Sequence, residues 1–109
     1  TLQTISNHKY ANILDNIGNI DITHNINFNL FEKVIKKVGG LKNNLTTQKN
    51  FLIKMGIEQR AELISKNQSF SKKVNIYFRL KRLIDEKQMG NLFKVMLIKN
   101  KNNKFKLGF

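Results

Sequence analysis

One convincing β-strand stands among three amphipathic helical segments in this chain, and that imbalance limits the folds open to it. The strand is Phe93–Ile98, a short apolar run that follows Gly90. A weak period-2 alternation makes Thr1–Tyr10 a second extended segment, and Leu41–Leu45 is a short strand or a connector. Three strands at most make a thin sheet for an independent domain. The helices need a larger sheet to cover, so we expect the chain to be one part of a larger α/β domain.

The first helical segment, Asn27–Val38, has the clearest periodicity. Its apolar residues recur at spacings of three and four and form one stripe. Asn25 or Asn27 is the candidate cap at its start. Gly39 and Gly40 follow it, and glycine accepts the left-handed conformation that ends helices. The pattern therefore predicts a helix with defined ends.

Two more helices are predicted directly after it. Thr46 or Thr47 is placed to cap a short helix, Gln48–Met55, which Gly56 ends. Ile57–Lys66 follows with apolar residues on one face and charged residues on the other. These signals are local, so the prediction does not depend on how the helices pack.

The last helical segment is Ser71–Ile84. It carries Val74, Tyr77 and Phe78 on one side, and Ser69 or Ser71 offers its cap. Beyond the final strand, residues 99–109 form a basic segment that we expect to be a solvated tail.

The net charge of +13 suggests a nucleic-acid partner, but the kind of cation argues against one. A strongly basic domain is the usual footprint of a nucleic-acid binder. Here 17 of the 20 cationic residues are Lys and only three are Arg, alongside 16 Asn and 13 Ile. Arg is the residue best suited to phosphate and base recognition, and it is scarce here. Lys, Asn and Ile share A- and T-rich codons, so an A+T-rich gene would enrich them whatever the protein does. Codon composition therefore accounts for the charge better than nucleic-acid binding does.

Several classes of site have no support in the residues. The chain has no cysteine, which removes disulfides, thiolate metal sites and a Cys nucleophile. His8 and His24 are its only histidines, no His-x-x-x-His spacing occurs, and no Ser lies in a nucleophile elbow. Gly39-Gly40 follows a helix, so it is not a phosphate-binding loop. No apolar run approaches the roughly 18 residues that a membrane span needs.

Four sequence motifs are each too weak to identify a family, but their combined order and spacing are specific. They are Thr1-Leu2-Gln3 with His8-Lys9-Tyr10; Asp21-Ile22-Thr23 with Ile26-Asn27-Phe28; Thr46-Thr47-Gln48-Lys49-Asn50-Phe51-Leu52-Ile53-Lys54-Met55-Gly56-Ile57-Glu58-Gln59-Arg60; and Met89-Gly90-Asn91-Leu92-Phe93-Lys94-Val95. In this order and spacing they resemble the motifs of the MidA-like SAM-dependent methyltransferases. That family includes the mitochondrial complex I assembly factor that methylates an arginine of a core subunit.

The resemblance implies a fold and an activity. The fold class would be α/β, with residues 1–109 forming the carboxyl-terminal portion of a Rossmann-like class I methyltransferase. Its helices would pack on a sheet whose final strand lies near 93–98. The cofactor would be S-adenosyl-L-methionine, bound mostly by a glycine-rich loop upstream of this segment, so the segment alone would be inactive. The substrate would be a protein arginine, such as one in a respiratory complex I subunit, in the bacterial cytoplasm or the mitochondrial matrix.

The same resemblance suggests which residues face the substrate. Asp21 and Thr23 lie ahead of a helix, where α/β proteins place ligand contacts, and are the first candidates for substrate binding. Gln48 and Arg60 are the second candidates, for which a structural role is an equal alternative, and no catalytic base is assigned. Asn27 stands where the family usually has an acidic residue, and an amide holds a guanidinium less strongly than a carboxylate does.

Two other functions stay open on sequence grounds. One is a small basic module that binds nucleic acid, for which the net charge is the argument. The other is a non-catalytic complex-assembly factor that keeps the fold but not the chemistry, for which Asn25 and Asn27 are the argument.

Overall fold

The chain divides into two compact units, Thr1–Val34 (unit 1) and Ile35–Phe109 (unit 2). The computed structural model describes residues 2–6, 9–10, 12, 14, 18 and 21–109. The segment Asn16-Ile17-Gly18-Asn19 has the composition of a turn, and it lies outside the described residues except for Gly18, which has a φ of 91°.

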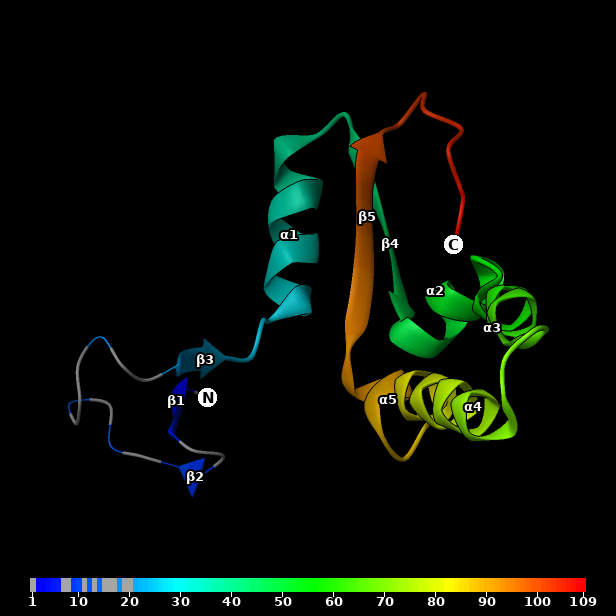
Figure 1. The fold of residues 1–109 in the computed structure, drawn as a ribbon. Helices are drawn as coiled ribbons and strands as arrows, with labels where there is room; N and C mark the ends of the chain where they lie inside the picture. The colour runs from blue at the N-terminus through cyan, green and yellow to red at the C-terminus, as the bar shows by residue number, and fades with distance from the viewer. Residues whose placement is uncertain (1, 7–8, 11, 13, 15–17, 19–20) are drawn as a thin grey trace. The chain divides into compact units, whose positions relative to one another are not determined.

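Unit 1 contains a three-stranded antiparallel sheet in the order β2-β1-β3 (Figure 1). Its strands are β1 (Leu2–Ser6), β2 (Lys9–Tyr10) and β3 (Asp21–His24). Thr4 of the central strand faces Ile22 of β3 in the register and is buried. The extended conformation predicted for the first ten residues is thus confirmed for the described part of that segment.

Helix α1 (Phe28–Val38) begins and ends at the predicted signals. The side-chain Oδ1 of Asn27 accepts a hydrogen bond from the backbone N–H of Leu30 at 3.1 Å, which satisfies one of the free donors of the first turn. After the last turn, Gly39 and Gly40 have φ values of 70° and 67°. Residues with a Cβ adopt this left-handed conformation rarely, which explains why two glycines end the helix.

Unit 2 is built around a two-stranded antiparallel ribbon (Figure 1). Strands β4 (Leu41–Thr47) and β5 (Lys94–Asn100) pair along their whole length, from Leu41 opposite Asn100 to Thr47 opposite Lys94. The predicted final strand is confirmed with its bounds shifted by one or two residues. The segment predicted as a strand or a connector is a strand.

Four helices follow β4 and precede β5 in the chain, and they gather at one end of the ribbon (Figure 1). They are α2 (Gln48–Lys54), α3 (Ile57–Ser65), α4 (Phe70–Ile84) and α5 (Met89–Leu92). α4 contacts α2, α3 and α5, whereas α2 and α5 also contact the strands. The expected layer of helices on a sheet is therefore reduced to two short helices at the ribbon's end, with α3 and α4 packed mainly on other helices.

The Thr47 cap is confirmed, and the cap of the long helix is only half confirmed. Thr47 Oγ1 accepts a hydrogen bond from the backbone N–H of Asn50 at 3.2 Å, at the start of α2. Ser69 is the residue before α4, but its side chain makes no capping hydrogen bond. The last short helix, α5, was not predicted, because four residues are too few to show a helical period.

The described part of the chain has a small apolar core. Ile35 and Ala61, each 6% exposed, are the apolar side chains that it buries. Many large apolar side chains are exposed instead, and two helices each carry four of them. Those helices carry Leu30, Phe31, Val34 and Val38 on α1, and Phe70, Val74, Tyr77 and Phe78 on α4. The amphipathic pattern predicted for the long helix is present, but the face with Val74, Tyr77 and Phe78 is exposed.

The basic segment 99–109 differs from the expected solvated tail. Lys99 and Asn100 belong to β5, and Lys99 is 8% exposed. The backbone N–H of Lys101 donates to the carbonyl of Gly40 at 2.9 Å. At the end of the chain the ring of Phe109 lies 5.5 Å from that of Phe51, centroid to centroid, in the tilted geometry that aromatic pairs favour. The segment thus turns back onto α2.

No described helix has the length and apolar character that a membrane span needs.

Candidate functional site

The first candidate residues lie on the strand that leads into a helix. Asp21 and Thr23 occupy alternate positions of β3 and so share one face of the strand. In the antiparallel register Asp21 faces Ile5 and Thr23 faces Gln3 of β1, and the Thr23 side chain is exposed. Three residues separate β3 from the start of α1. The predicted strand-to-helix junction is therefore present, and Thr23 is accessible at it.

Asn27, at a position where the family that the sequence resembles usually has an acidic residue, is engaged in helix capping. Its side-chain oxygen accepts the hydrogen bond from the Leu30 backbone described above. Asp and Asn cap helices about equally well. Replacing a carboxylate by this amide thus keeps the start of α1 and removes only a negative charge.

Gln48 is tied into the junction between the helices and the ribbon. Its backbone N–H donates to the carbonyl of Phe93 at 2.9 Å, just beyond the last paired residues of the two strands. Its side-chain Nε2 donates to the carbonyl of Leu83 near the end of α4, also at 2.9 Å. Gln48 is half-buried, and its two hydrogen bonds join α2 to α4 and to the residue before β5, which is a structural role. Its substrate-binding role stays a prediction.

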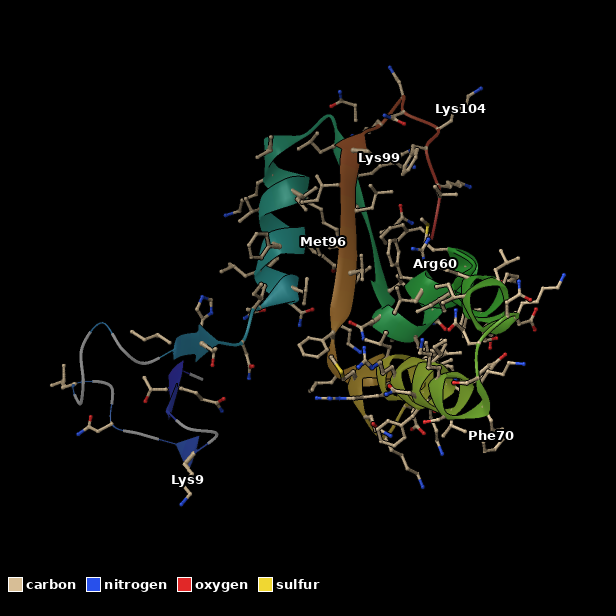
Figure 2. The ribbon with its side chains drawn as sticks, in the orientation of Figure 1. Lys9, Arg60, Phe70, Met96, Lys99 and Lys104 are labelled. Atoms are coloured by element: carbon tan, nitrogen blue, oxygen red, sulfur yellow. The ribbon has the colours of Figure 1, made fainter. Side chains whose placement is uncertain are left out.

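Arg60 is exposed on α3, with its backbone N–H bonded to the carbonyl of Gly56 at 3.0 Å (Figure 2). Asp21 and Thr23 belong to unit 1, and Gln48 and Arg60 to unit 2. Within unit 2, none of the described hydrogen bonds or salt bridges links Gln48 to Arg60. Their role in substrate binding remains a prediction.

A hollow of about 860 Å³ lies between α2, α3, α4 and the turn that follows α4. Charges of both signs line it, and Lys49 Nζ forms a salt bridge with Glu86 Oε1 at 2.6 Å. Lys49 is half-buried and Glu86 is exposed, so solvent still screens the pair and it contributes on the order of 1 kcal/mol. Asp85, also in the lining, accepts the backbone N–H of Lys87 at 2.8 Å and so closes the turn. No pattern in the sequence indicates this hollow, because its lining comes from segments that only the fold brings together.

Lys99 is the one described group whose pKa is clearly displaced. Burial, and then the nearby ammonium groups of Lys42 and Lys106, hold the pKa of Lys99 below its ordinary value of 10.5. Its Nζ donates to the carbonyl of Phe105, in the segment that turns back from β5 (Figure 2). A displaced pKa is a sign of a functional site when the group faces a cleft. Here the ammonium is occupied by a backbone carbonyl, so we assign Lys99 to the anchoring of this segment.

The described residues offer neither a metal site nor a nucleotide loop. They contain no group of three or more His, Asp or Glu side chains arranged to hold a metal ion. Within residues 21–109 the left-handed glycines lie after α1, between α2 and α3, and near the end of the chain. None of these sits between a strand and a following helix, where backbone N–H groups cradle the anionic part of a cofactor. The residues present therefore do not form a binding loop for S-adenosyl-L-methionine by themselves.

Comparison with known proteins relates this geometry to part of a larger fold. No protein-family profile matches the chain. An uncharacterized protein of the COG1565 superfamily from Burkholderia thailandensis has a similar structure, with a TM-score of 0.81 and 23% sequence identity over 99% of this chain. A second COG1565 superfamily member from the same organism, described as a candidate methyl transferase and solved with S-adenosyl-homocysteine bound, gives a TM-score of 0.75 and 25% identity over 99% of this chain.

The matched region is a minor part of those proteins. This chain corresponds to 29% of the first protein and 28% of the second, so it spans less than a third of either. The expected fold is confirmed at the level of a mixed α/β segment that matches part of a COG1565 superfamily structure.

Proposed function

We propose that this chain is the carboxyl-terminal, acceptor-side part of a class I methyltransferase that uses S-adenosyl-L-methionine. The observation that carries the proposal is the match of 99% of the chain to a candidate methyl transferase holding S-adenosyl-homocysteine, the product that methyl transfer leaves behind. The four motifs of the sequence support it independently, because they occur in order along the same residues. This chain has no donor loop among its described residues, so the donor site belongs to the rest of the enzyme.

The contribution of this chain is to position the acceptor. Methyl transfer depends on aligning donor and acceptor in line, and most of its acceleration comes from that alignment. The strand-to-helix junction at β3 offers Asp21 and Thr23 for this purpose. A carboxylate binds a guanidinium through charge-assisted, often bidentate hydrogen bonds, which suits a protein arginine as the acceptor. A subunit of respiratory complex I is the acceptor that the family resemblance suggests.

Binding of a polyanion is the second candidate function, and the distribution of charge favours it. Unit 2 holds 18 of the 20 Lys and Arg residues but only four of the seven Asp and Glu residues. Nucleic-acid binding that rests on this charge would weaken steeply and linearly on a log–log plot as salt is added. A methyltransferase segment has no such requirement, so the salt slope separates the two functions.

The test uses the complete translation product of the gene that encodes this chain. Titration calorimetry with S-adenosyl-homocysteine should show saturable binding, and radiolabelled methyl groups should pass from the donor to a protein in extracts of the host. Asp21→Asn should keep cofactor binding but lower methyl incorporation by about ten- to a hundredfold, the value of a hydrogen bond to a charged group.

Glu62→Gln is the matched control, because it also removes one carboxylate, exposed on α3. It should leave both readouts unchanged. Failure to bind S-adenosyl-homocysteine would overturn the proposed function. Full methyl incorporation by Asp21→Asn would leave the enzyme assignment standing and remove Asp21 from the acceptor site.

A further inference from the structure

Helix α4 has two apolar faces, and the fold covers only one of them. Its half-buried residues Ile76, Leu80 and Leu83 lie on the side that contacts the other helices. Phe70, Val74 and Phe78 are exposed by 83%, 52% and 70%. They recur every four residues and so form a ridge along the helix, of the kind that packs into the groove of another helix. Figure 2 shows Phe70 at the amino-terminal end of this helix.

Two shallow hollows flank this ridge. One has a volume of about 530 Å³ and is lined by Phe70, Lys73, Val74, Tyr77, Phe78 and Lys81. The other has a volume of about 520 Å³ and is lined by Ser71, Val74, Asn75, Phe78, Arg79 and Arg82. Val74 and Phe78 belong to both. A ridge between two hollows matches the surface of a second helix, whose side chains fill the hollows while its groove receives the ridge.

The charge of this face is of one sign. α4 carries Lys72, Lys73, Arg79, Lys81 and Arg82 and no acidic residue. Four of the five line the hollows, two in each. They include two of the three arginines of the chain. None of the five forms an ion pair within the described part of the chain.

The exposed face of α1 differs in charge from that of α4, and this difference indicates what kind of surface binds α4. Its residues Leu30, Phe31, Val34 and Val38 form a row with no charged residue inside it, which suits burial against the rest of an apolar core. On α4, Lys81 lies on the same side as Phe70, Tyr77 and Phe78, so whatever covers the apolar ridge also covers an ammonium group. A buried ammonium is costly unless a carboxylate meets it.

We propose that the outer face of α4 binds an acidic amphipathic helix of a partner protein. The apolar residues of that helix enter the two hollows, and its carboxylates pair with Lys73 and Lys81 on one side and with Arg82 on the other. The four-residue spacing of the ridge favours a helix over a nucleic acid, because that spacing matches the groove of a second helix, while the rings of Phe70 and Phe78 make base stacking the alternative that the experiment must separate. The paired hollows favour a helix over a flat lipid surface. This surface is distinct from the residues assigned to the acceptor and does not depend on methyl transfer.

The experiment measures binding of a designed helix to the complete gene product. The probe is a fluorescein-labelled peptide of about 18 residues, or about five helical turns, with Leu and Phe along one face and Glu beside them. Fluorescence anisotropy should give saturable binding. A scrambled peptide of the same composition, which has no apolar face, should bind at least about tenfold more weakly. Hydrogen exchange should slow within residues 70–82 when the first peptide is added.

Two variants of the same helix and the same change of charge test the geometry. Lys81→Glu should weaken peptide binding by about tenfold or more, because it removes one partner of a covered ion pair. Lys72→Glu should change it by less than about twofold, because Lys72 lines neither hollow and a peripheral exposed charge contributes little. A peptide with Lys in place of Glu should bind Lys81→Glu better than the unaltered protein.

Three outcomes would overturn the proposal. The first is an absence of saturable binding, which would mean that the remainder of the enzyme already covers α4. The second is an equal loss of affinity in Lys72→Glu and Lys81→Glu, which would reduce the interaction to net charge. The third is binding of an oligouridine or of phosphatidylserine vesicles that depends on Phe78 and Lys81 while the acidic peptide does not bind.

Discussion

A Cβ atom built on Gly90 would lie 2.4 Å from the carbonyl oxygen of Ile84 and 2.8 Å from that of Asp85. Its backbone N–H donates to the same Asp85 carbonyl at 2.9 Å, so α5 is fixed against the end of α4. Met89-Gly90 opens the fourth of the sequence motifs. The end of α4 is the neighbour that requires glycine at position 90, and the reason is close backbone approach.

Replacing Gly90 by Ala should therefore destabilise the fold. The backbone atoms it would meet cannot rotate away as a side chain can, so we expect a loss of about 1–3 kcal/mol, as for overpacked sites. Asn91→Ala, at the next and exposed position of α5, should change stability by less than about 0.5 kcal/mol. Urea unfolding followed by circular dichroism measures both. Equal midpoints for the two variants would contradict the close-approach argument.

Helices α1 to α4 were predictable because their signals are local, whereas the pairing of the two ribbon strands was not. Asn27 and Thr47 cap the helices that they precede, and the apolar spacing fixed the extents of α1 to α4 to within about two residues. The pairing of β4 with β5 joins residues separated by four intervening helices, and no local pattern encodes it. The polar pair Asn43-Asn44 also made β4 hard to predict. The strand is only half buried, so it accepts polar residues that are uncommon in strands.

Two caps that look alike in the sequence should differ in strength. Thr47 precedes α2 and its hydroxyl accepts the Asn50 N–H, whereas Ser69 precedes α4 without such a bond. Thr47→Ala should therefore cost about 1 kcal/mol, the usual value of an N-cap side chain. Ser69→Ala should cost less than about half of that, since it removes no hydrogen bond. Thermal or urea unfolding of the two variants measures the difference, and a larger loss for Ser69→Ala would contradict the observed cap geometry.

For the molecule as a whole, the mixed α/β class of the fold is confirmed, whereas the substrate-binding residues stay a prediction. Asp21 and Thr23 do lie at a strand-to-helix junction, but Gln48 proves to be a tie between α2, α4 and β5. The apolar pattern of α4 does not predict which of its two apolar faces the fold covers. Periodicity identifies apolar positions on a helix, but it does not identify the element that packs against them. The hollows beside Val74 and Phe78 are visible only once that neighbour is known.

The exposed apolar face of α1 should make the isolated chain associate with itself. Val34 is 50% exposed in a row that carries no charge, whereas the α4 faces of two copies repel each other. The net charge of +13 opposes association at every distance, so added salt should strengthen it by screening that repulsion.

Sedimentation equilibrium of residues 1–109 at low and high salt measures this association. Val34→Gln should weaken it by about tenfold, the value of losing burial of one such apolar side chain. Lys33→Gln, exposed on the same helix, should strengthen it slightly because it removes one positive charge. A chain that stays monomeric at high salt, or an equal weakening by both variants, would mean that α1 is not the associating face.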